Sequence, residues 1–217
     1  MINIQDQEKL FSDAGKFLKK KIVCYAIGGT AMMYLGLKEN TKDIDLVFLN
    51  KEDRKIFKEA LLKIGYKEME SRIIYGAREN SPQMLYLADW RLDLFLPEVI
   101  DFIFSVDAQK RIVETHVYDN LTIKIADPHD ILLMKSATER EKDIDDAKAI
   151  IDNNKINWNI IVQEVKNQQN LGKQRTGLDL GVFLENLEAK GVKIPKKIKD
   201  DIWDIVKVVA ESKIKKK

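Results

Sequence analysis

The chain has 217 residues, of which 45% are hydrophobic and 33% are charged, with 10 glycines and 4 prolines. This composition excludes a disordered, collagen-like or loop-dominated protein and predicts a globular chain of ordinary size. The single cysteine, Cys24, excludes an internal disulfide framework and a cysteine-rich zinc site, and it favours a reducing, cytoplasmic location.

The charges are nearly balanced, because 37 basic and 35 acidic side chains leave a net charge of +2. Such a balance gives no whole-protein field that would imply a nucleic-acid partner. No run approaches the roughly 18 apolar residues of a membrane-spanning helix, and the first ten residues lack the apolar centre of a signal peptide. We therefore expect no membrane partner.

The first predicted strand covers residues 21–27, a short and densely apolar run. It is closed by Gly28 and Gly29, which predict a tight turn. Thr30 is the candidate N-cap of a short apolar helix that ends near Gly36.

A second buried strand is predicted over residues 43–49, where acidic and apolar residues alternate before the run becomes wholly apolar. Asn50 then caps an amphipathic helix over 51–64, whose apolar residues recur at three- and four-residue spacing. The order strand, helix, strand, helix predicts an α/β layer.

Residues 67–97 have the pattern of a meander, and 111–126 that of a hairpin that turns at Asp119-Asn120. The strands expected in the meander are 73–75, 84–87 and 92–96. Everything later is predicted to be helical, beginning with a helix from Pro128 to about residue 138.

Thr138 and Glu141 have the capping-box spacing and predict a helix through residue 151. Three further apolar helix faces follow, at 158–165, 178–187 and 198–209. The chain is thus α/β over residues 1–126 and all-α over residues 127–217.

Asp43 and Asp45 are two apart on a predicted strand, so their carboxylates share one face. Two like charges held together repel, and a divalent cation such as Mg²⁺ or Mn²⁺ is the usual means of keeping both ionised. The alternative is a solvated acid pair at a strand edge. Asp93 interrupts an apolar strand, where an unpaired charge is costly, so it needs either the same cation or a basic partner such as Arg91.

The glycines ahead of this acid pair allow backbone N–H groups to approach a phosphate, although an ordinary tight turn would also explain them. Together, the Gly-Gly-Thr motif at 28–30, the Asp-Ile-Asp motif at 43–45 and Asp93 resemble the DNA polymerase β-like nucleotidyltransferase superfamily. The segment 127–146 is similar to the helical segment of minimal nucleotidyltransferases akin to the abortive-infection type IV toxins.

The resemblance implies a mixed β-sheet core with flanking helices and a C-terminal helical region. It assigns triphosphate binding to Gly28, Gly29 and Thr30, and it assigns two Mg²⁺ ions to Asp43, Asp45 and Asp93. Asp93 would also help the acceptor hydroxyl to lose its proton. Lys135 would reach the triphosphate or the acceptor, and Asp143 would orient a neighbouring group.

For these last two residues the sequence leaves a plain alternative. Lys135 is also explained as a solvated helix charge paired with Glu139, and Asp143 as a first-turn acid that the helix dipole favours.

The resemblance predicts an enzyme that transfers a nucleoside monophosphate from an NTP to a hydroxyl and releases pyrophosphate. tRNA or protein is the expected acceptor, with a small molecule as an alternative, and a toxin of this type would have a cognate antitoxin. A catalytically silent module of the same fold, which senses nucleotide or binds protein, is the alternative from another class.

Basic segments at 19–21, 193–199 and 213–217 offer a route to RNA phosphates. Aromatic residues are not interleaved with them, so stacking on bases is not indicated, and solvated surface is the favoured interpretation. For 213–217 the expectation is a frayed, solvated terminus.

Overall fold

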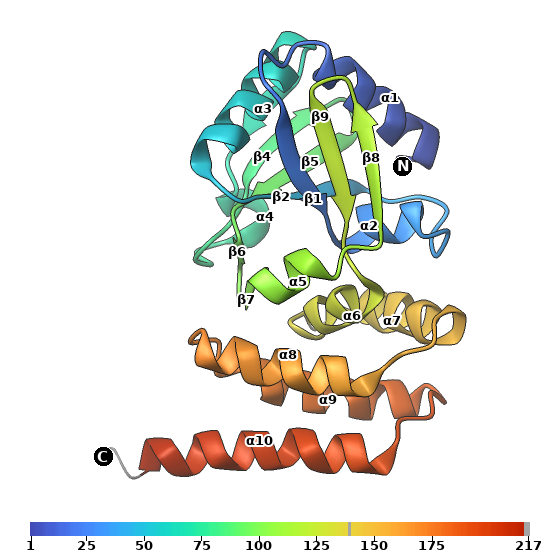
Figure 1. Ribbon diagram of the computed structural model, residues 1–217, viewed down its shortest axis with the longest axis vertical. Helices are drawn as coiled ribbons and strands as arrows, with labels where there is room; N and C mark the ends of the chain where they lie inside the picture. Colours follow the sequence, from blue (N-terminus) through green and yellow to red (C-terminus); the bar gives the residue numbers. More distant parts are fainter. Residues whose placement is uncertain (139, 215–217) are drawn as a thin grey trace. The chain divides into compact units, whose positions relative to one another are not determined.

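The structure is a computed structural model that describes residues 1–138 and 140–214. The chain divides into two compact units (Figure 1). The first comprises residues 1–100 and 106–127, and the second comprises residues 101–105 together with the chain from Pro128 onward.

The first unit is built on a seven-stranded sheet with the order β3-β4-β5-β2-β1-β9-β8. Its strands are β1 (Ile22–Ala26), β2 (Asp43–Phe48), β3 (Lys67–Met69), β4 (Gln83–Leu87), β5 (Trp90–Phe95), β8 (Glu114–Tyr118) and β9 (Leu121–Ile125). The pairs β1–β9 and β2–β5 are parallel, whereas the other neighbouring strands are antiparallel. The predicted mixed sheet is therefore confirmed.

Helices α1 (Ile4–Gly15) and α3 (Lys51–Lys63) pack against each other, and α1 also contacts β8 and β9 while α3 contacts β1 and β2 (Figure 1). Phe57 of α3 is fully buried, and its ring centroid lies 5.3 Å from that of Phe48 on β2. The predicted cap is also confirmed, because the Asn50 side chain accepts a hydrogen bond from the backbone N–H of Asp53 at 2.8 Å. Helix α1 was not predicted from the sequence.

Helix α2 (Gly28–Tyr34) differs from the prediction at its start. Gly28 and Gly29 belong to its first turn rather than to a turn ahead of it, and Ile27 takes the N-cap position. Thr30 does not cap the helix, because its hydroxyl accepts a hydrogen bond from the backbone N–H of Asp45 instead. The expected end near Gly36 is confirmed.

The prediction of a meander over residues 67–97 is partly wrong. Residues 73–75 lie in the short helix α4 (Arg72–Tyr75), and the unpredicted strand β3 pairs with β4. Ile73 and Ile74 are 68% and 49% exposed, so they lack the buried face that a strand of this sheet would need. Strands β4 and β5 and the β8–β9 hairpin occur as predicted, with Asp119 at a positive φ of 52° in the turn.

Three short elements lie between β5 and β8 and were not predicted. They are β6 (Glu98–Val99), β7 (Phe102–Ile103) and α5 (Val106–Lys110). Residues of β7 belong to the second unit, where the buried Gln168 side chain accepts from the N–H of Ile103 at 2.9 Å and donates to its carbonyl at 2.6 Å. A buried amide thus satisfies both backbone groups of this residue.

From Pro128 onward the described chain is helical, as the apolar spacing predicts. The helices of this part are α6 (Pro128–Ser136), α7 (Glu141–Asn153), α8 (Trp158–Asn170), α9 (Thr176–Ala189) and α10 (Lys196–Ile214). Helix α9 contacts α6, α7, α8 and α10, and fully buried residues such as Ile150, Val165 and Leu184 form the core. The predicted capping box is wrong, because Arg140 is the N-cap of α7 and the Thr138 hydroxyl bonds to Asp143.

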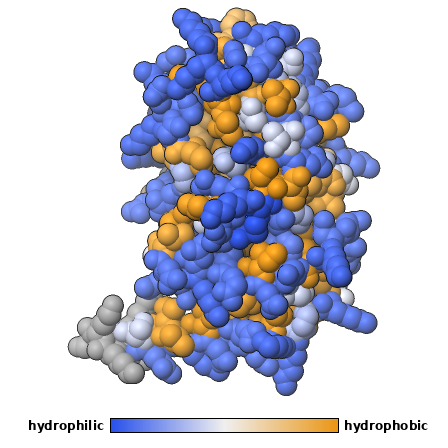
Figure 2. Space-filling model, viewed as in Figure 1, coloured by the Kyte–Doolittle hydropathy of each residue, from blue (hydrophilic) through white to orange (hydrophobic). Residues whose placement is uncertain are grey.

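Hydrophilic residues predominate on the face drawn in Figure 2, and hydrophobic residues lie between them. Scattered exposed apolar residues of this kind are normal for a folded protein surface. Within residues 1–138 and 140–214, no helix combines the length and apolar character needed to cross a bilayer.

Candidate active site

Four charged residues occupy facing positions on the neighbouring parallel strands β2 and β5. Asp43 is the register partner of Arg91, and Asp45 is the register partner of Asp93. Side chains two apart on a strand share a face, and directly paired residues of neighbouring strands do so as well. All four side chains therefore lie on one face, which we call the acidic face.

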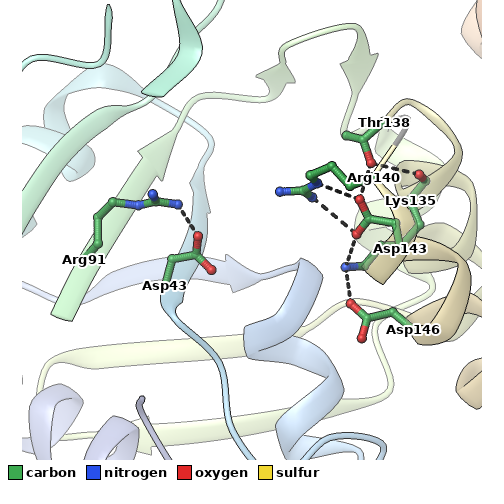
Figure 3. Close-up of polar contacts among 7 residues, drawn as sticks. All are labelled: Asp43, Arg91, Lys135, Thr138, Arg140, Asp143 and Asp146. Carbon is green, nitrogen blue, oxygen red and sulfur yellow. Dashed lines mark hydrogen bonds and ion pairs between the residues drawn. The ribbon is translucent and has the colours of Figure 1, made fainter. Parts of the chain in front are cut away.

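Arg91 joins two of these carboxylates. Its Nη2 is paired with Oδ2 of Asp43 (Figure 3), and its Nε lies 3.0 Å from Oδ1 of Asp93. The second contact is an ion pair without hydrogen-bond geometry, so neither of its two atoms has a hydrogen-bond partner among the described residues. Of the two partners expected for Asp93, the structure contains the basic one.

Tyr75 completes the surroundings of Asp93. Its hydroxyl donates a hydrogen bond to Oδ2 of Asp93 at 2.5 Å, and its ring meets that of Phe95 edge-on with centroids 6.2 Å apart. Tyr75 is not among the predicted site residues, because residues 73–75 were expected in a strand. No local signal identified it, since the contact depends on the short helix α4.

Burial and neighbouring charges shift the pKa values of Asp93 and Arg91 in opposite directions. Burial raises the pKa of Asp93 to about 6, although Arg91 and the Tyr75 hydrogen bond pull it down. Burial, together with the charges of Asp45 and Asp93, raises the pKa of Tyr75 well above its usual range, so its phenol stays protonated and acts as a donor. For Arg91, burial lowers the pKa, but the neighbouring carboxylates outweigh it and the net shift is upward.

The Gly-Gly-Thr motif packs against β2 beside the acidic face. Gly28 has a φ of +54°, and a Cβ built there would lie 2.8 Å from Oδ2 of Asp45. A Cβ on Gly29 would lie 2.7 Å from Oγ1 of Thr41. The Thr30 hydroxyl, which is fully buried, accepts from the backbone N–H of Asp45 at 2.8 Å. The motif and the acid pair are thus brought together, and the motif holds the backbone at Asp45.

The donor chemistry of the acidic face fits a divalent cation. Three carboxylates on one face of the paired strands β2 and β5 supply the hard oxygen ligands that Mg²⁺ and Mn²⁺ prefer. Oδ1 of Asp93 is buried without a hydrogen-bond partner among the described residues. Those residues nevertheless include no three His, Cys, Asp or Glu side chains grouped closely enough to hold a metal ion. In this structure Arg91 and Tyr75 take up carboxylate oxygens instead.

A separate ion-pair cluster lies in the second unit (Figure 3). Lys135 of α6 donates to Oδ1 of Asp143 at 2.8 Å and to Oδ2 of Asp146 at 2.5 Å, both on α7. Asp143 also accepts from the Thr138 hydroxyl and from Arg140, whose Nε lies 2.7 Å from Oδ2. These residues, 135, 138, 140, 143 and 146, are the lysine cluster below.

The lysine cluster excludes one of the two interpretations left open for Lys135. The side chain is buried, so it is not a solvated helix charge, and the suggested partner Glu139 lies outside the described residues. Burial alone would lower the pKa of Lys135 and raise that of Asp143, but their mutual attraction reverses both shifts. Both groups are therefore held in their charged forms, while a role in nucleotide or acceptor binding stays a prediction.

The basic segments are partly neutralised by neighbouring acids. Lys20 contacts Glu52 at 2.7 Å and Asp53 at 3.0 Å, and Lys199 contacts Glu188 at 2.7 Å. These pairs agree with solvated, ion-paired surface. In the third segment, Lys215 to Lys217 lie outside the described residues, so the predicted frayed terminus is not addressed.

No family model matches the chain, and no curated protein matches it either. Among solved structures, it is similar to ANT(2'')-Ia in complex with adenylyl-2''-tobramycin, with 15% identity and a TM-score of 0.45 over 83% of this chain and 98% of that chain.

A nucleotidyltransferase-like antigenic protein from Paracoccidioides brasiliensis has 17% identity and a TM-score of 0.39, over 69% of this chain and 77% of that one. A nucleotidyltransferase described from H. pylori has 13% identity and a TM-score of 0.36, over 98% and 97%. Similarities this low do not transfer an activity to the present chain.

Proposed function

We propose that this chain is a nucleotidyltransferase that moves a nucleoside monophosphate from an NTP to a hydroxyl acceptor and releases pyrophosphate. The observation that carries the proposal is the register of β2 and β5, which sets Asp43, Asp45 and Asp93 on one face. Negatively charged carboxylates on one face repel each other. Such an arrangement is expected where the protein must bind positive charge.

In the proposed enzyme, Asp43, Asp45 and Asp93 hold Mg²⁺, with Mn²⁺ as an alternative. Bound as a pair, such ions would stabilise the attacking and leaving oxygens of in-line transfer. Asp93 would help the acceptor hydroxyl to lose its proton. This assignment is supported by the oxygen donors of the acidic face and by the buried Oδ1 of Asp93.

The triphosphate is assigned to the Gly-Gly-Thr motif. Without side chains, Gly28 and Gly29 leave backbone that a phosphate can approach closely. The Thr30 hydroxyl contributes by fixing the backbone of Asp45, which supports a positioning role in addition to the predicted phosphate contact.

Lys135 and Asp143 are assigned to the same activity. We propose that Lys135 acts on the triphosphate or the acceptor, and that Asp143 orients it through their 2.8 Å contact. Support comes from burial, because an ion pair taken out of water gains little net stability and is often retained for another reason.

We further propose that the acceptor is a tRNA or protein hydroxyl and that the chain is the toxin of a toxin–antitoxin pair. Support for this part is the similarity of segment 127–146 to the toxin-like enzymes. A small-molecule acceptor is the competing assignment within the same reaction class.

A catalytically silent nucleotide-sensing or protein-binding module is the second candidate. The observation that favours it is the ion pairing of Asp43 and Asp93 with Arg91, which gives two of the three carboxylates a basic partner without a metal. The two candidates differ in whether the carboxylates are needed for a covalent product.

The test is label transfer from each of the four α-labelled NTPs, with Mg²⁺, into a total cell extract resolved into RNA, protein and small molecules. The wild type is compared with Asp43→Asn/Asp45→Asn and with Asp89→Asn, an exposed acid of the same unit. We expect label with the wild type and Asp89→Asn but not with the double variant.

The labelled fraction would name the acceptor class. Label that persists in the double variant, or no label in any fraction while NTP binding is detected, would contradict the enzyme and favour the silent module.

A further inference from the structure

Arg91 is the basic member of the acidic face. It is two residues before Asp93 on β5 and directly opposite Asp43 on β2. Its guanidinium contacts both carboxylates, through Nη2 to Asp43 and through Nε to Asp93 at 3.0 Å. A single side chain therefore bridges the two acids at the positions where the proposed cation would need their oxygens.

The four charges of this face do not cancel, because one guanidinium stands among three carboxylates. Arginine stays protonated throughout the working pH range, so it competes for these oxygens as a fixed positive charge. A carboxylate oxygen that is held by Arg91 is not available to a divalent ion at the same time. Cation binding therefore requires the guanidinium to withdraw.

We propose that Arg91 is an exchangeable counter-ion, which neutralises Asp43 and Asp93 in the cation-free protein and gives up both carboxylates when a divalent cation binds. This inference rests on the proposed function, which assigns the cation to these residues. Arg91 is thereby a positioning residue that sets how tightly the site takes its metal.

The structure supports withdrawal of Arg91 more than withdrawal of the acids. The Arg91 side chain is 22% exposed, whereas that of Asp43 is 16% exposed and that of Asp93 is fully buried. Tyr75 holds the other oxygen of Asp93 at 2.5 Å, so this carboxylate keeps a hydrogen bond when the guanidinium leaves. The acids stay in place while the arginine exchanges.

Replacing Arg91 by glutamine separates this role from a purely structural one. Without the guanidinium, the carboxylates repel each other, and the cation-free variant should be less stable than the wild type. Its affinity for a divalent cation should rise by about tenfold or more, since a competing positive charge has been removed. Cation binding should then restore the lost stability.

The experiment is a titration of the metal-free full-length chain with Mn²⁺ alone, followed by calorimetry and by the electron paramagnetic resonance of free Mn²⁺. Thermal unfolding is measured with and without Mn²⁺. Arg54→Gln is the matched control, because Arg54 of the same unit donates to the carbonyl of Leu94 at 3.4 Å. The Arg54→Gln variant should bind Mn²⁺ as tightly as the wild type. Any stability that it loses should not be specifically restored by Mn²⁺.

Tighter Mn²⁺ binding by Arg91→Gln, together with recovery of its unfolding temperature on adding Mn²⁺, would support the inference. Equal Mn²⁺ affinity of the wild type and Arg91→Gln would overturn the inference. The proposed function would still stand in that case if Asp43→Asn/Asp45→Asn abolished Mn²⁺ binding and label transfer. Absence of Mn²⁺ binding in every variant would overturn the inference together with the metal assignment, and label transfer would judge the activity separately.

Arg91→Lys covers the case in which Arg91→Gln does not fold. Lysine keeps the charge but lacks the planar fork that lets one arginine contact two carboxylates. Its Mn²⁺ affinity should therefore lie above that of the wild type, and an affinity equal to or below the wild-type value would overturn the inference.

Discussion

The hydroxyl of Tyr75 donates a 2.5 Å hydrogen bond to Oδ2 of Asp93, across a separation of 18 residues in the sequence. Asp93 is fully buried, and a buried carboxylate needs such donors to stay charged. The contact ties the short helix α4 to the strand that carries the acid. It therefore links the local structure of residues 72–75 to the chemistry of the acidic face.

Tyr75→Phe should destabilise the protein by about 1–3 kcal/mol, because it removes a donor from a buried charged acceptor. Tyr66→Phe is the matched control, since Tyr66 is buried and its hydroxyl has no hydrogen-bond partner among the described residues. Its cost should be near zero. Urea unfolding of both variants measures the difference, and equal costs would show that the Tyr75 contact contributes nothing.

Gly28→Ala should impair both folding and transfer. The positive φ of Gly28 costs an alanine about 1–2 kcal/mol, and the new Cβ would also press on Asp45 from 2.8 Å. Gly36→Ala has a similar φ of +67° but no atom within 4 Å of its Cβ, so it carries the backbone cost alone.

We expect transfer by Gly28→Ala to fall by about tenfold or more, since small displacements of reacting groups are costly, and transfer by Gly36→Ala to remain. Label-transfer rates and urea unfolding check both variants. Similar rates for the two would refute the close approach of Gly28 to Asp45.

Thr30→Val should weaken the site without changing the size of the side chain. The substitution leaves the backbone N–H of Asp45 without its acceptor, at a cost of about 1–3 kcal/mol in unfolding free energy. Thr30→Ser keeps the hydroxyl and should recover most of both stability and transfer. A serine variant as impaired as the valine variant would show that the methyl group, rather than the hydroxyl, matters.

Asp143→Asn should destabilise the protein by about 3 kcal/mol near neutral pH, because it breaks a buried ion pair. Asp152→Asn removes an exposed i,i+4 pair with Lys148 on the same helix, and it should cost less than about 1 kcal/mol. Urea unfolding across a pH series measures both variants against the wild type.

The cost of Asp143→Asn should depend on pH in a stated direction. The folded pKa of Asp143 lies below its unfolded value of about 3.9, so its contribution is present above that pH and is lost as pH falls through the folded value. The folded pKa of Lys135 is raised, so its contribution is complete below about 10.4 and is lost as pH rises through the folded value. A cost that grows on acidification would contradict this assignment.

Much of the fold follows from local sequence patterns. Dense apolar runs predicted β1 and β2, and three- and four-residue apolar spacing predicted α3 and the later helices. The Thr30 cap and the 138–141 capping box were wrong, because the Thr30 hydroxyl bonds to the backbone of Asp45 on the next strand and the Thr138 hydroxyl bonds to the Asp143 side chain. Local rules cannot foresee a competing partner of this kind.

The sequence by itself determined that Asp43 and Asp45 share a face, because the period of a strand is a property of its own backbone. It also placed the Gly-Gly-Thr motif of residues 28–30 ahead of them in the chain. Only the tertiary structure decided that β2 pairs with β5 in the register that sets Asp45 opposite Asp93 and Asp43 opposite Arg91. Strand order, the Arg91–Asp43 ion pair and the Tyr75–Asp93 hydrogen bond depend on the packing of segments that are not neighbours in the chain, and no local pattern encodes that packing.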